Sequence, residues 1–341
     1  MKKTILFTGG GTCGHISPNL AMMEYLRGTY NFAYIGTNGM EKQMVTDFGV
    51  KFYEIETPKF SRKLNMSLIK LPFQVARAKN NCKKLLKKIQ PDIVFSKGGY
   101  VAIPVVLAAH ALGIPIISHE SDFSMGLANK IIYRYCNVMC TSFDNFSSKK
   151  KCVVTGTPLR ENFYQKSSTF NPFEKSHVKT TLLFMGGSLG AKAINQFVWD
   201  NINDLTSKYN VLHIVGKGNF NKSICSKNYY QTEFSNNIAD FYRTTDIVVC
   251  RSGSGTIFEL LECKKKMILI PLPKDCSRGD QIENALYFKK HHNAQVIMQD
   301  ELNMQTLQTC INATLKSGPS QKSNLLDARE KISQIIQSNI R

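Results

Sequence analysis

The sequence predicts an α/β protein of two domains, each a parallel β-sheet with helices on both faces. The chain has 341 residues, enough for two separate hydrophobic cores at roughly 100–200 residues per domain. Hydrophobic residues make up 43% and charged residues 20% of the chain, which is typical of folded globular proteins. Short β-branched runs alternate with helical stretches in both halves, and this alternation indicates parallel sheets joined by crossover helices.

The expected strands are short apolar runs bounded by glycines, polar residues or helical stretches. In the first half they are Thr4–Thr8, Phe32–Ile35, Phe52–Ile55, Ile93–Ser96, Ile114–Ser118, Val138–Thr141 and Val153–Thr155. In the second half they are Thr181–Met185, Val211–Val215, Tyr230–Glu233, Ile247–Cys250, Met267–Ile270 and Gln295–Met298. Each half therefore has the pattern of a Rossmann-like domain.

The joint between the domains is expected near Asn162–Lys179, where a polar run interrupts the periodicity. We therefore assign residues 1–161 to an N-terminal domain and residues 162–341 to a C-terminal domain. Ligands of open α/β sheets bind at the carboxyl ends of the strands. The loops that follow the strands are thus expected to face a central cleft between the two sheets.

The net charge of the chain is +19, of which residues 1–160 carry +13 and residues 161–341 carry +6. This excess predicts an anionic partner for the first half: a phosphorylated ligand, an acidic membrane surface or nucleic acid. The chain has no recognised nucleic-acid module, and such a partner would leave its glycine-rich turns unexplained. We therefore expect no nucleic acid.

The cysteines and the N-terminus indicate a reducing cytoplasm. Ten cysteines occur without a Cys-x-x-Cys pair, and the chain enters its first strand without the apolar region of a signal peptide. The stretch Gly98–His119 has no formally charged residue and is long enough to span a bilayer. However, Pro104 and Gly113-Ile114-Pro115 divide it into a short helix and a strand, which favours a buried α/β segment.

The first strand runs into the glycine-rich loop Gly9-Gly10-Gly11-Thr12-Cys13-Gly14-His15. The loop matches G-x-G-x-x-G, but a nicotinamide-binding domain would also place an acidic residue at the end of the second strand, where Ile35–Gly39 has none. His15 stands where the loop enters a helix, and an imidazole suits removal of a proton from a sugar hydroxyl. We interpret it as a general base, the alternative being a structural histidine.

Two further glycine turns follow strands in the second half, Gly186–Ala191 and Arg251–Thr256, and each offers free backbone amides to an anion. Glu259 follows the latter by one turn and could accept both hydroxyls of a ribose. Arg160 stands just past a strand, well placed for a diphosphate. The chain has no Asp-x-Asp and no clustered metal ligands, so we expect no protein-bound metal and assign the leaving-group charge to amides and arginine.

These motifs, with others between them, occur in order across nearly the whole chain and resemble the bacterial lipid II-forming N-acetylglucosaminyltransferases, the MurG family. The motifs that carry the resemblance are Gly9-Gly10-Gly11-Thr12-x-Gly14-His15, Ser96-Lys97-Gly98-Gly99-Tyr100, His119-Glu120, Gly126-Leu127-Ala128-Asn129-Lys130, Gly186-Gly187-Ser188-x-Gly190-Ala191, Arg251-Ser252-Gly253 with Glu259, and Asp280-Gln281-x-x-Asn284-Ala285.

The resemblance implies a GT-B fold, in which two Rossmann-like domains face a central cleft. It implies transfer of N-acetylglucosamine from UDP-N-acetylglucosamine, the donor substrate, to the C4 hydroxyl of the muramoyl sugar of lipid I, an undecaprenyl-diphosphate acceptor, with inversion. The product, lipid II, serves peptidoglycan synthesis, and with it cell wall biogenesis, cell shape and cell division. The N-terminal domain would face the acceptor and the C-terminal domain would bind the UDP-sugar.

The resemblance also assigns roles residue by residue. His15 is the expected base, with Glu120 next in line, and the remaining expected contacts are all to the donor. They are Thr12, Cys13 and Gly14 on the donor sugar, Arg160 and Ser188 on the diphosphate, Glu259 on the ribose and Gln281 on the sugar hydroxyls. Four residues depart from the common family pattern, namely Cys13, Ser121, Asp122 and Asp280.

Residues 57–91 contain ten Lys or Arg and no carboxylate. Part of this charge is the solvated face of an expected amphipathic helix. The apolar Phe60, Leu64, Met66 and Phe73 among the cations are not explained in that way. We expect the segment to dock reversibly on an anionic membrane surface, as a peripheral protein on the cytoplasmic face of the bacterial cell membrane.

One alternative within the same fold remains: another GT-B enzyme that uses a UDP-sugar, either a diacylglycerol glycosyltransferase or a UDP-sugar epimerase. A basic nucleic-acid-binding protein without enzymatic activity is the alternative from another class.

Overall fold

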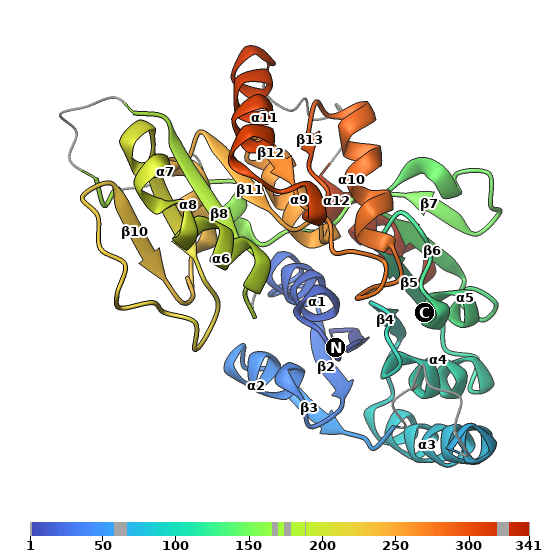
Figure 1. Cartoon of the computed structure of the whole chain (residues 1–341). Helices are drawn as coiled ribbons and strands as arrows, with labels where there is room; N and C mark the ends of the chain where they lie inside the picture. The colour runs from blue at the N-terminus through green and yellow to red at the C-terminus, as the bar shows by residue number, and fades with distance from the viewer. Residues whose placement is uncertain are drawn as a thin grey trace. The chain divides into compact units, whose positions relative to one another are not determined.

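The computed structural model describes residues 2–57, 67–165, 170–173, 179–187, 189–318 and 327–340. The chain forms two compact α/β units (Figure 1). One comprises Met1–Glu161 with Leu325–Arg341, and the other comprises Asn162–Asn324.

The first unit is built on a seven-stranded sheet with the order β3-β2-β1-β4-β5-β6-β7, and all of its neighbouring strands pair in parallel. Its strands are β1 (Thr4–Thr8), β2 (Asn31–Gly36), β3 (Lys51–Glu54), β4 (Ile93–Ser96), β5 (Ile116–Glu120), β6 (Val138–Thr141) and β7 (Cys152–Val154). Its helices are α1 (Cys13–Tyr25), α2 (Met40–Asp47), α3 (Ser67–Ile89), α4 (Ala102–Ala111), α5 (Leu127–Ile132) and α12 (Ala328–Asn339), with a short 3-10 turn, η1 (Asp144–Phe146).

The second unit has a six-stranded parallel sheet with the order β10-β9-β8-β11-β12-β13. Its strands are β8 (Thr181–Met185), β9 (Asn210–Ile214), β10 (Tyr229–Thr232), β11 (Ile247–Cys250), β12 (Lys266–Leu269) and β13 (Gln295–Val296). Its helices are α6 (Lys192–Asp200), α7 (Ile202–Lys208), α8 (Ile238–Thr244), α9 (Ser254–Glu262), α10 (Asp280–His291) and α11 (Met304–Lys316). The 3-10 turn η2 (Glu161–Phe163) crosses the chain boundary between Glu161 and Asn162, where the first unit gives way to the second, and η3 (Gln299–Glu301) precedes α11.

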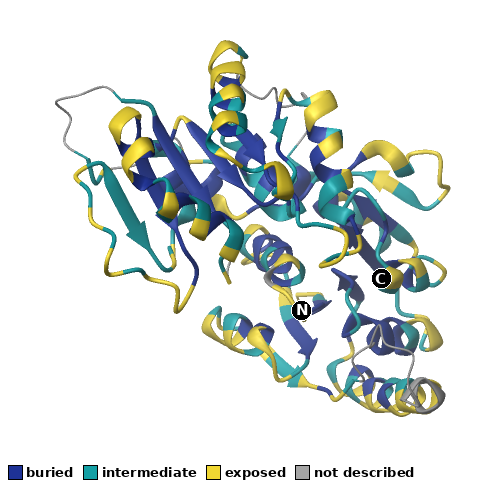
Figure 2. Ribbon diagram, in the orientation of Figure 1, coloured by how far each residue is buried: buried dark blue, intermediate teal, exposed yellow. Residues whose placement is uncertain are grey.

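Alternating side chains of the first sheet enter two cores. Ile5 and Phe7 of β1 pack with α1, α2 and α12, whereas Leu6 packs with α3, α4 and α5. The inner strands β1, β4, β5 and β6 are accordingly buried in Figure 2, as expected for a parallel sheet covered on both faces, whereas the edge strands β3 and β7 are partly exposed. In both units the strand order reverses at one point, between β1 and β4 and between β8 and β11. Ligands of doubly wound sheets bind at such switch points.

The last helix corrects the predicted domain assignment, which placed residues 162–341 together. α12 belongs to the first unit, because the fully buried Ile332 and Ile336 complete the core beneath α1. Arg329 holds the helix there through a 2.6 Å ion pair with Glu161. The apolar residues along this helix show from the sequence that one of its faces is buried. They do not show which of the two sheets that face packs against.

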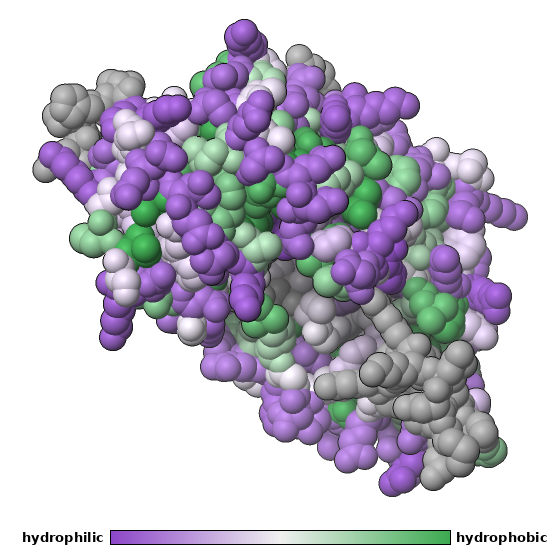
Figure 3. Space-filling model, viewed as in Figure 1, coloured by the Kyte–Doolittle hydropathy of each residue, from purple (hydrophilic) through white to green (hydrophobic). Residues whose placement is uncertain are grey.

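The predicted parallel sheets, their strands and the buried α/β reading of the uncharged stretch are confirmed. Each of the thirteen predicted strands corresponds to a strand of the structure, with ends that coincide or differ by one or two residues. The uncharged stretch Gly98–His119 divides into the buried helix α4 and strand β5. None of the described helices is long and apolar enough to cross a membrane, and hydrophilic side chains cover most of the face drawn in Figure 3.

Candidate active site

The glycine-rich loop of the first unit connects β1 to α1 at the switch point. Its turn needs glycine at Gly10, because a Cβ there would overlap the Glu41 carboxylate. The loop after β4 needs glycine at Gly99, because a Cβ there would lie 2.9 Å from the Gly10 carbonyl oxygen. The backbone N–H of His15 donates to the Thr12 carbonyl at 3.0 Å, which closes the first turn of α1. The loop thus presents Thr12, Gly14 and His15 together.

The His15 side chain is half-buried, and its Nδ1 lies 2.9 Å from the Thr12 hydroxyl. If the ring donates from Nδ1 to this hydroxyl, Nε2 keeps the lone pair that a general base requires. Gly99, in the loop after β4, packs against the ring, since a Cβ there would lie 3.5 Å from Nδ1. The side chain of Cys13 lies outside the described residues.

A buried network of hydrogen bonds fixes the start of the glycine-rich loop. Tyr34 of β2 donates its hydroxyl to the Gly9 carbonyl at 2.6 Å, and Asn19 of α1 donates to both Tyr34 and the Thr8 carbonyl. Burial raises the pKa of Tyr34 far above its ordinary value, so the hydroxyl stays protonated and donates. Tyr34 and Asn19 were missed by sequence reasoning, because each is also an ordinary core position of its strand or helix.

Glu120, the alternative base, is buried at the end of β5 with both carboxylate oxygens engaged. Oε1 accepts the Asp122 amide at 3.0 Å, and Oε2 accepts the Gly126 amide and the Asn129 side chain, each at 3.0 Å. This arrangement shapes the loop between β5 and α5. Burial lowers the pKa of the neighbouring Lys97, while the charges of Glu120 and Asp122 oppose the shift.

His119 precedes Glu120 and is fully buried. Burial and the Lys97 charge lower its pKa to about 3, so the ring is neutral near pH 7. Its Nε2–H donates to the Gly156 carbonyl at 2.9 Å. This nitrogen therefore carries a proton and cannot accept one, which distinguishes His119 from His15.

Arg160 also belongs to the first unit and follows β7. It is exposed, and its Nε lies 3.9 Å from the Glu24 carboxylate of α1, a distance at the outer limit of an ion pair. Such a contact contributes little to stability. The guanidinium thus keeps most of its capacity to bind an anion.

The glycine turn after β8 in the second unit is shaped by its own backbone. Gly190 has a φ of +77°, and a Cβ there would overlap the Val215 carbonyl oxygen. Asn195 of α6 donates to the same carbonyl at 2.8 Å. Gly187 has no atom within 4 Å of its Cβ position, so the turn is open on that side. The predicted diphosphate contact Ser188 lies outside the described residues.

The turn after β11 leads into the N-terminus of α9. Arg251 is buried and donates to the carbonyls of Ile270 and Pro271 at 3.1 Å, so it braces the loop after β12. Added Cβ atoms at Gly253 and Gly255 would meet nothing within 4 Å. Open space therefore lies over the first amides of a nine-residue helix, which favours an anion there.

Glu259 lies one turn into α9. Its carboxylate accepts the Tyr242 hydroxyl at 3.0 Å. Burial raises the pKa of Glu259 to about 7, although the hydrogen bond from Tyr242 acts in the opposite direction. A diol that donates two hydrogen bonds would restore the ionised form. Tyr242 was missed because it lies on α8, far from Glu259 in the sequence.

Gln281 stands in the first turn of α10, close to the α9 turn. Ser252 donates its hydroxyl to the Gln281 carbonyl at 2.8 Å, and the Gln281 side-chain oxygen accepts the Leu272 amide at 3.1 Å. Asp280, a departure from the family pattern, forms a 3.1 Å ion pair with Arg278. The structure thus brings Glu259 and Gln281 to neighbouring elements of one unit.

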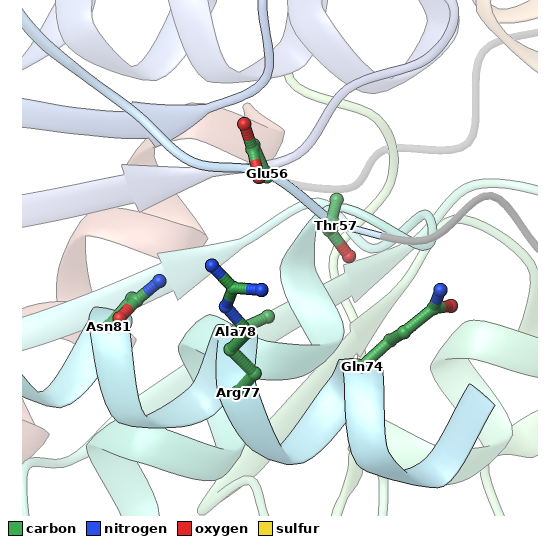
Figure 4. A pocket seen from close by; sticks show the side chains of 6 residues that line it. All are labelled: Glu56, Thr57, Gln74, Arg77, Ala78 and Asn81. Atoms are coloured by element: carbon green, nitrogen blue, oxygen red, sulfur yellow. The ribbon is translucent and has the colours of Figure 1, made fainter. Parts of the chain in front are cut away.

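A cavity of about 280 Å³ lies elsewhere in the first unit and contains none of the predicted site residues. In Figure 4 the Arg77 side chain extends from α3 towards the segment of Glu56 and Thr57, with Gln74 and Asn81 beside it. Across the part of the chain that the structure describes, no group of three His, Cys, Asp or Glu side chains could hold a metal ion.

Two α/β units with parallel sheets are typical of the two-domain glycosyltransferases of the GT-B class. An imidazole at one switch point and an open helix N-terminus near a carboxylate in the other unit are compatible with that class. Solved structures agree with this fold. MurG of Acinetobacter baumannii has a TM-score of 0.78 at 25% identity and covers 98% of this chain and 99% of its own. A UDP-GlcNAc 2-epimerase from Methanocaldococcus jannaschii shares the fold at 13% identity, with a TM-score of 0.62 and coverage of 99% and 100%.

The chain belongs to glycosyltransferase family 28 and, within it, to the MurG family. The family's N-terminal domain matches residues 5–141 and its C-terminal domain matches residues 181–338. A UDP-N-acetylglucosamine–N-acetylmuramyl-(pentapeptide) pyrophosphoryl-undecaprenol N-acetylglucosamine transferase from Clostridium tetani is 41% identical over 89% of this chain and 87% of its own. A transferase of the same name from Clostridium botulinum is 40% identical over 91% and 90%.

Proposed function

We propose that the protein transfers N-acetylglucosamine from UDP-N-acetylglucosamine to the C4 hydroxyl of the muramoyl sugar of lipid I, forming lipid II for peptidoglycan synthesis. The observation that carries the proposal is the 41% identity to a transferase of that name over 89% of the chain. The epimerase alternative rests on 13% identity, which supports a shared fold alone. The wider roles in cell shape and cell division follow from the product.

In the proposed reaction, His15 Nε2 takes the proton of the acceptor hydroxyl while its oxygen attacks the anomeric carbon of the donor. The bond from that carbon to the diphosphate breaks, UDP leaves, and the configuration inverts. This step requires the tautomer in which Nδ1 donates to the Thr12 hydroxyl, 2.9 Å away, because Nε2 then keeps its lone pair. Glu120 has a positioning role in this scheme, because three donors already occupy its carboxylate.

The second unit is proposed to bind the donor. Glu259 accepts the ribose hydroxyls, the first amides of α9 and Ser188 meet the diphosphate, and Gln281 contacts the sugar hydroxyls. The open space over Gly253 and Gly255 supports this assignment. Arg160 adds a cation for the leaving diphosphate, and Thr12, Cys13 and Gly14 line the donor sugar.

Docking on an anionic membrane surface is proposed for residues 57–91, on the cytoplasmic face of the membrane. Residues 58–66, which hold Phe60, Leu64 and Met66, lie outside the described residues. On α3, Phe73 is 78% exposed, while Ala78 and Cys82 of the same helix are buried. An exposed aromatic ring beside a basic helix face suits an interfacial contact with anionic lipid.

The test is a radiolabelled-donor assay with purified lipid I and, in parallel, diacylglycerol. We expect label in lipid II only. Transfer to diacylglycerol instead would contradict the proposal, and conversion of the donor to an epimer without any acceptor would favour the epimerase alternative.

A further inference from the structure

Glu41 is a fully buried carboxylate that has no role in the mechanism above. It belongs to the first turn of α2, beyond the end of β2, and turns back under the glycine-rich loop after β1. Its Oε1 accepts the Thr37 amide at 3.1 Å and the Thr37 hydroxyl at 2.5 Å, and its Oε2 accepts the Gly11 amide at 3.4 Å. The carboxylate therefore joins the loops that follow two neighbouring strands.

Three glycines surround this carboxylate. A Cβ at Gly10 would overlap it, one at Gly39 would lie 2.7 Å from Oε2, and one at Gly36 would lie 3.1 Å from the Glu41 Cγ. Burial of a carboxylate is costly unless donors replace its water. Here the donors come from Thr37 and from the loop that carries Thr12 and His15.

The Gly11 amide is the point at which Glu41 acts on the site. Thr12 follows Gly11 directly, and its hydroxyl sets the His15 ring through the 2.9 Å contact with Nδ1. A rotation of the Gly11 peptide would move that hydroxyl. A neutral amide in place of the carboxylate cannot accept from both loops, because its NH₂ would face either Gly11 N–H or the Thr37 donors.

We propose that Glu41 is a positioning residue for acceptor activation, which holds the Gly11 peptide and through it the Thr12–His15 pair. The inference rests on the proposed role of His15 as the base.

The test compares Glu41→Gln with Glu54→Gln in the full-length protein. Glu54 is a matched control in the same unit, since its side chain is 44% exposed and forms a 2.9 Å ion pair with Lys42 at the surface. We expect Glu41→Gln to lower kcat with lipid I by about 10–100-fold, with UDP affinity within about twofold. Thr37→Val, which removes one donor, should lower kcat less. Glu54→Gln should change neither quantity.

A second measurement is independent of activity. Nitrogen-15 NMR of the histidine rings, assigned with His15→Ala, should show a change in the His15 ring nitrogens in Glu41→Gln and none in Glu54→Gln. Unchanged His15 signals, or a parallel loss of UDP binding and of thermal stability, would overturn the inference. If the wild type fails to glycosylate lipid I, the proposed function fails, whereas the His15 signals still decide the role of Glu41.

Discussion

The two units use the same strand–glycine turn–helix element, but their turns differ in what surrounds them. The turn after β1 lies against the buried Glu41 carboxylate. The turn after β11 lies under open space at Gly253 and Gly255. The residues around a glycine turn therefore determine what the turn can bind. The turn that packs against the Glu41 carboxylate presents the imidazole of His15, whereas the turn with open space beside it can offer its amides to an anionic ligand.

The largest expected effect is on the first turn. His15→Ala should lower kcat with lipid I by ~10²–10⁴-fold, because a general base acts in the transition state. UDP affinity, measured by calorimetry, should stay unchanged if the donor binds the second unit. His110→Ala, at an exposed histidine of the same unit, is the control. Wild-type turnover in His15→Ala would require another base.

The second turn is tested through its carboxylate. Glu259→Gln should weaken UDP binding by roughly 10–100-fold, since hydrogen bonds to a charged group contribute ~1.5–3 kcal/mol. Turnover at saturating donor should change much less. Glu262→Gln, on the last turn of the same helix, serves as the control. Equal UDP affinity in Glu259→Gln and wild type would refute the ribose assignment.

Adding a methyl group to each turn tests the difference directly. Gly10→Ala should lower the free energy of unfolding by ~1–3 kcal/mol, because its Cβ would overlap the Glu41 carboxylate. Gly253→Ala, with nothing within 4 Å, should leave the thermal midpoint nearly unchanged. It should weaken UDP-N-acetylglucosamine binding if the diphosphate occupies that space. Equal thermal stability of the two variants would contradict the comparison.

The pH dependence of donor binding should arise from Glu259 in the second unit. The pKa of Glu259 is raised to about 7, and only the ionised carboxylate accepts hydrogen bonds from two hydroxyls. The affinity for UDP-N-acetylglucosamine should therefore decrease as the pH is lowered below 7, by up to about tenfold per pH unit. The same pKa shift lowers the free energy of unfolding as the pH rises from 4.5 to 7, because over this range the native state binds the Glu259 proton more tightly than the unfolded state does.

Calorimetry across pH 5–8 measures the pH dependence of donor affinity. If that dependence persists in Glu259→Gln, Glu259 is not its origin.

The smallest expected effect concerns the charge asymmetry. Vesicle sedimentation should show binding that rises with anionic lipid and falls with salt, since each cation near the surface contributes ~1 kcal/mol before screening. Replacing Arg62, Lys63 and Phe73 should reduce binding several-fold. Replacing the exposed Lys208 and Lys217 of the second unit should not. Indifference to lipid charge, salt and the first set of replacements would reject docking through residues 57–91.

The sequence by itself determined the strands, the glycine turns and the placing of His15, Arg160 and Glu259 after strands. These features are local: a strand is a short apolar run, and a turn needs glycine at positions next to one another in the chain. Parallel sheets then carry all such turns to one edge. This is why the α/β class and most of the candidate residues could be predicted without coordinates.

Tertiary structure alone decided which groups surround those residues. The Glu41 carboxylate of α2 and the Tyr34 hydroxyl of β2 bind the first turn, while the Tyr242 hydroxyl of α8 donates to Glu259. α12 joined the first unit because its apolar stripe matched the core under α1. Contacts between distant segments depend on packing and burial. The sequence shows that one face of a helix is apolar or that a carboxylate is present. It does not show which residues of other elements pack against that face or that carboxylate.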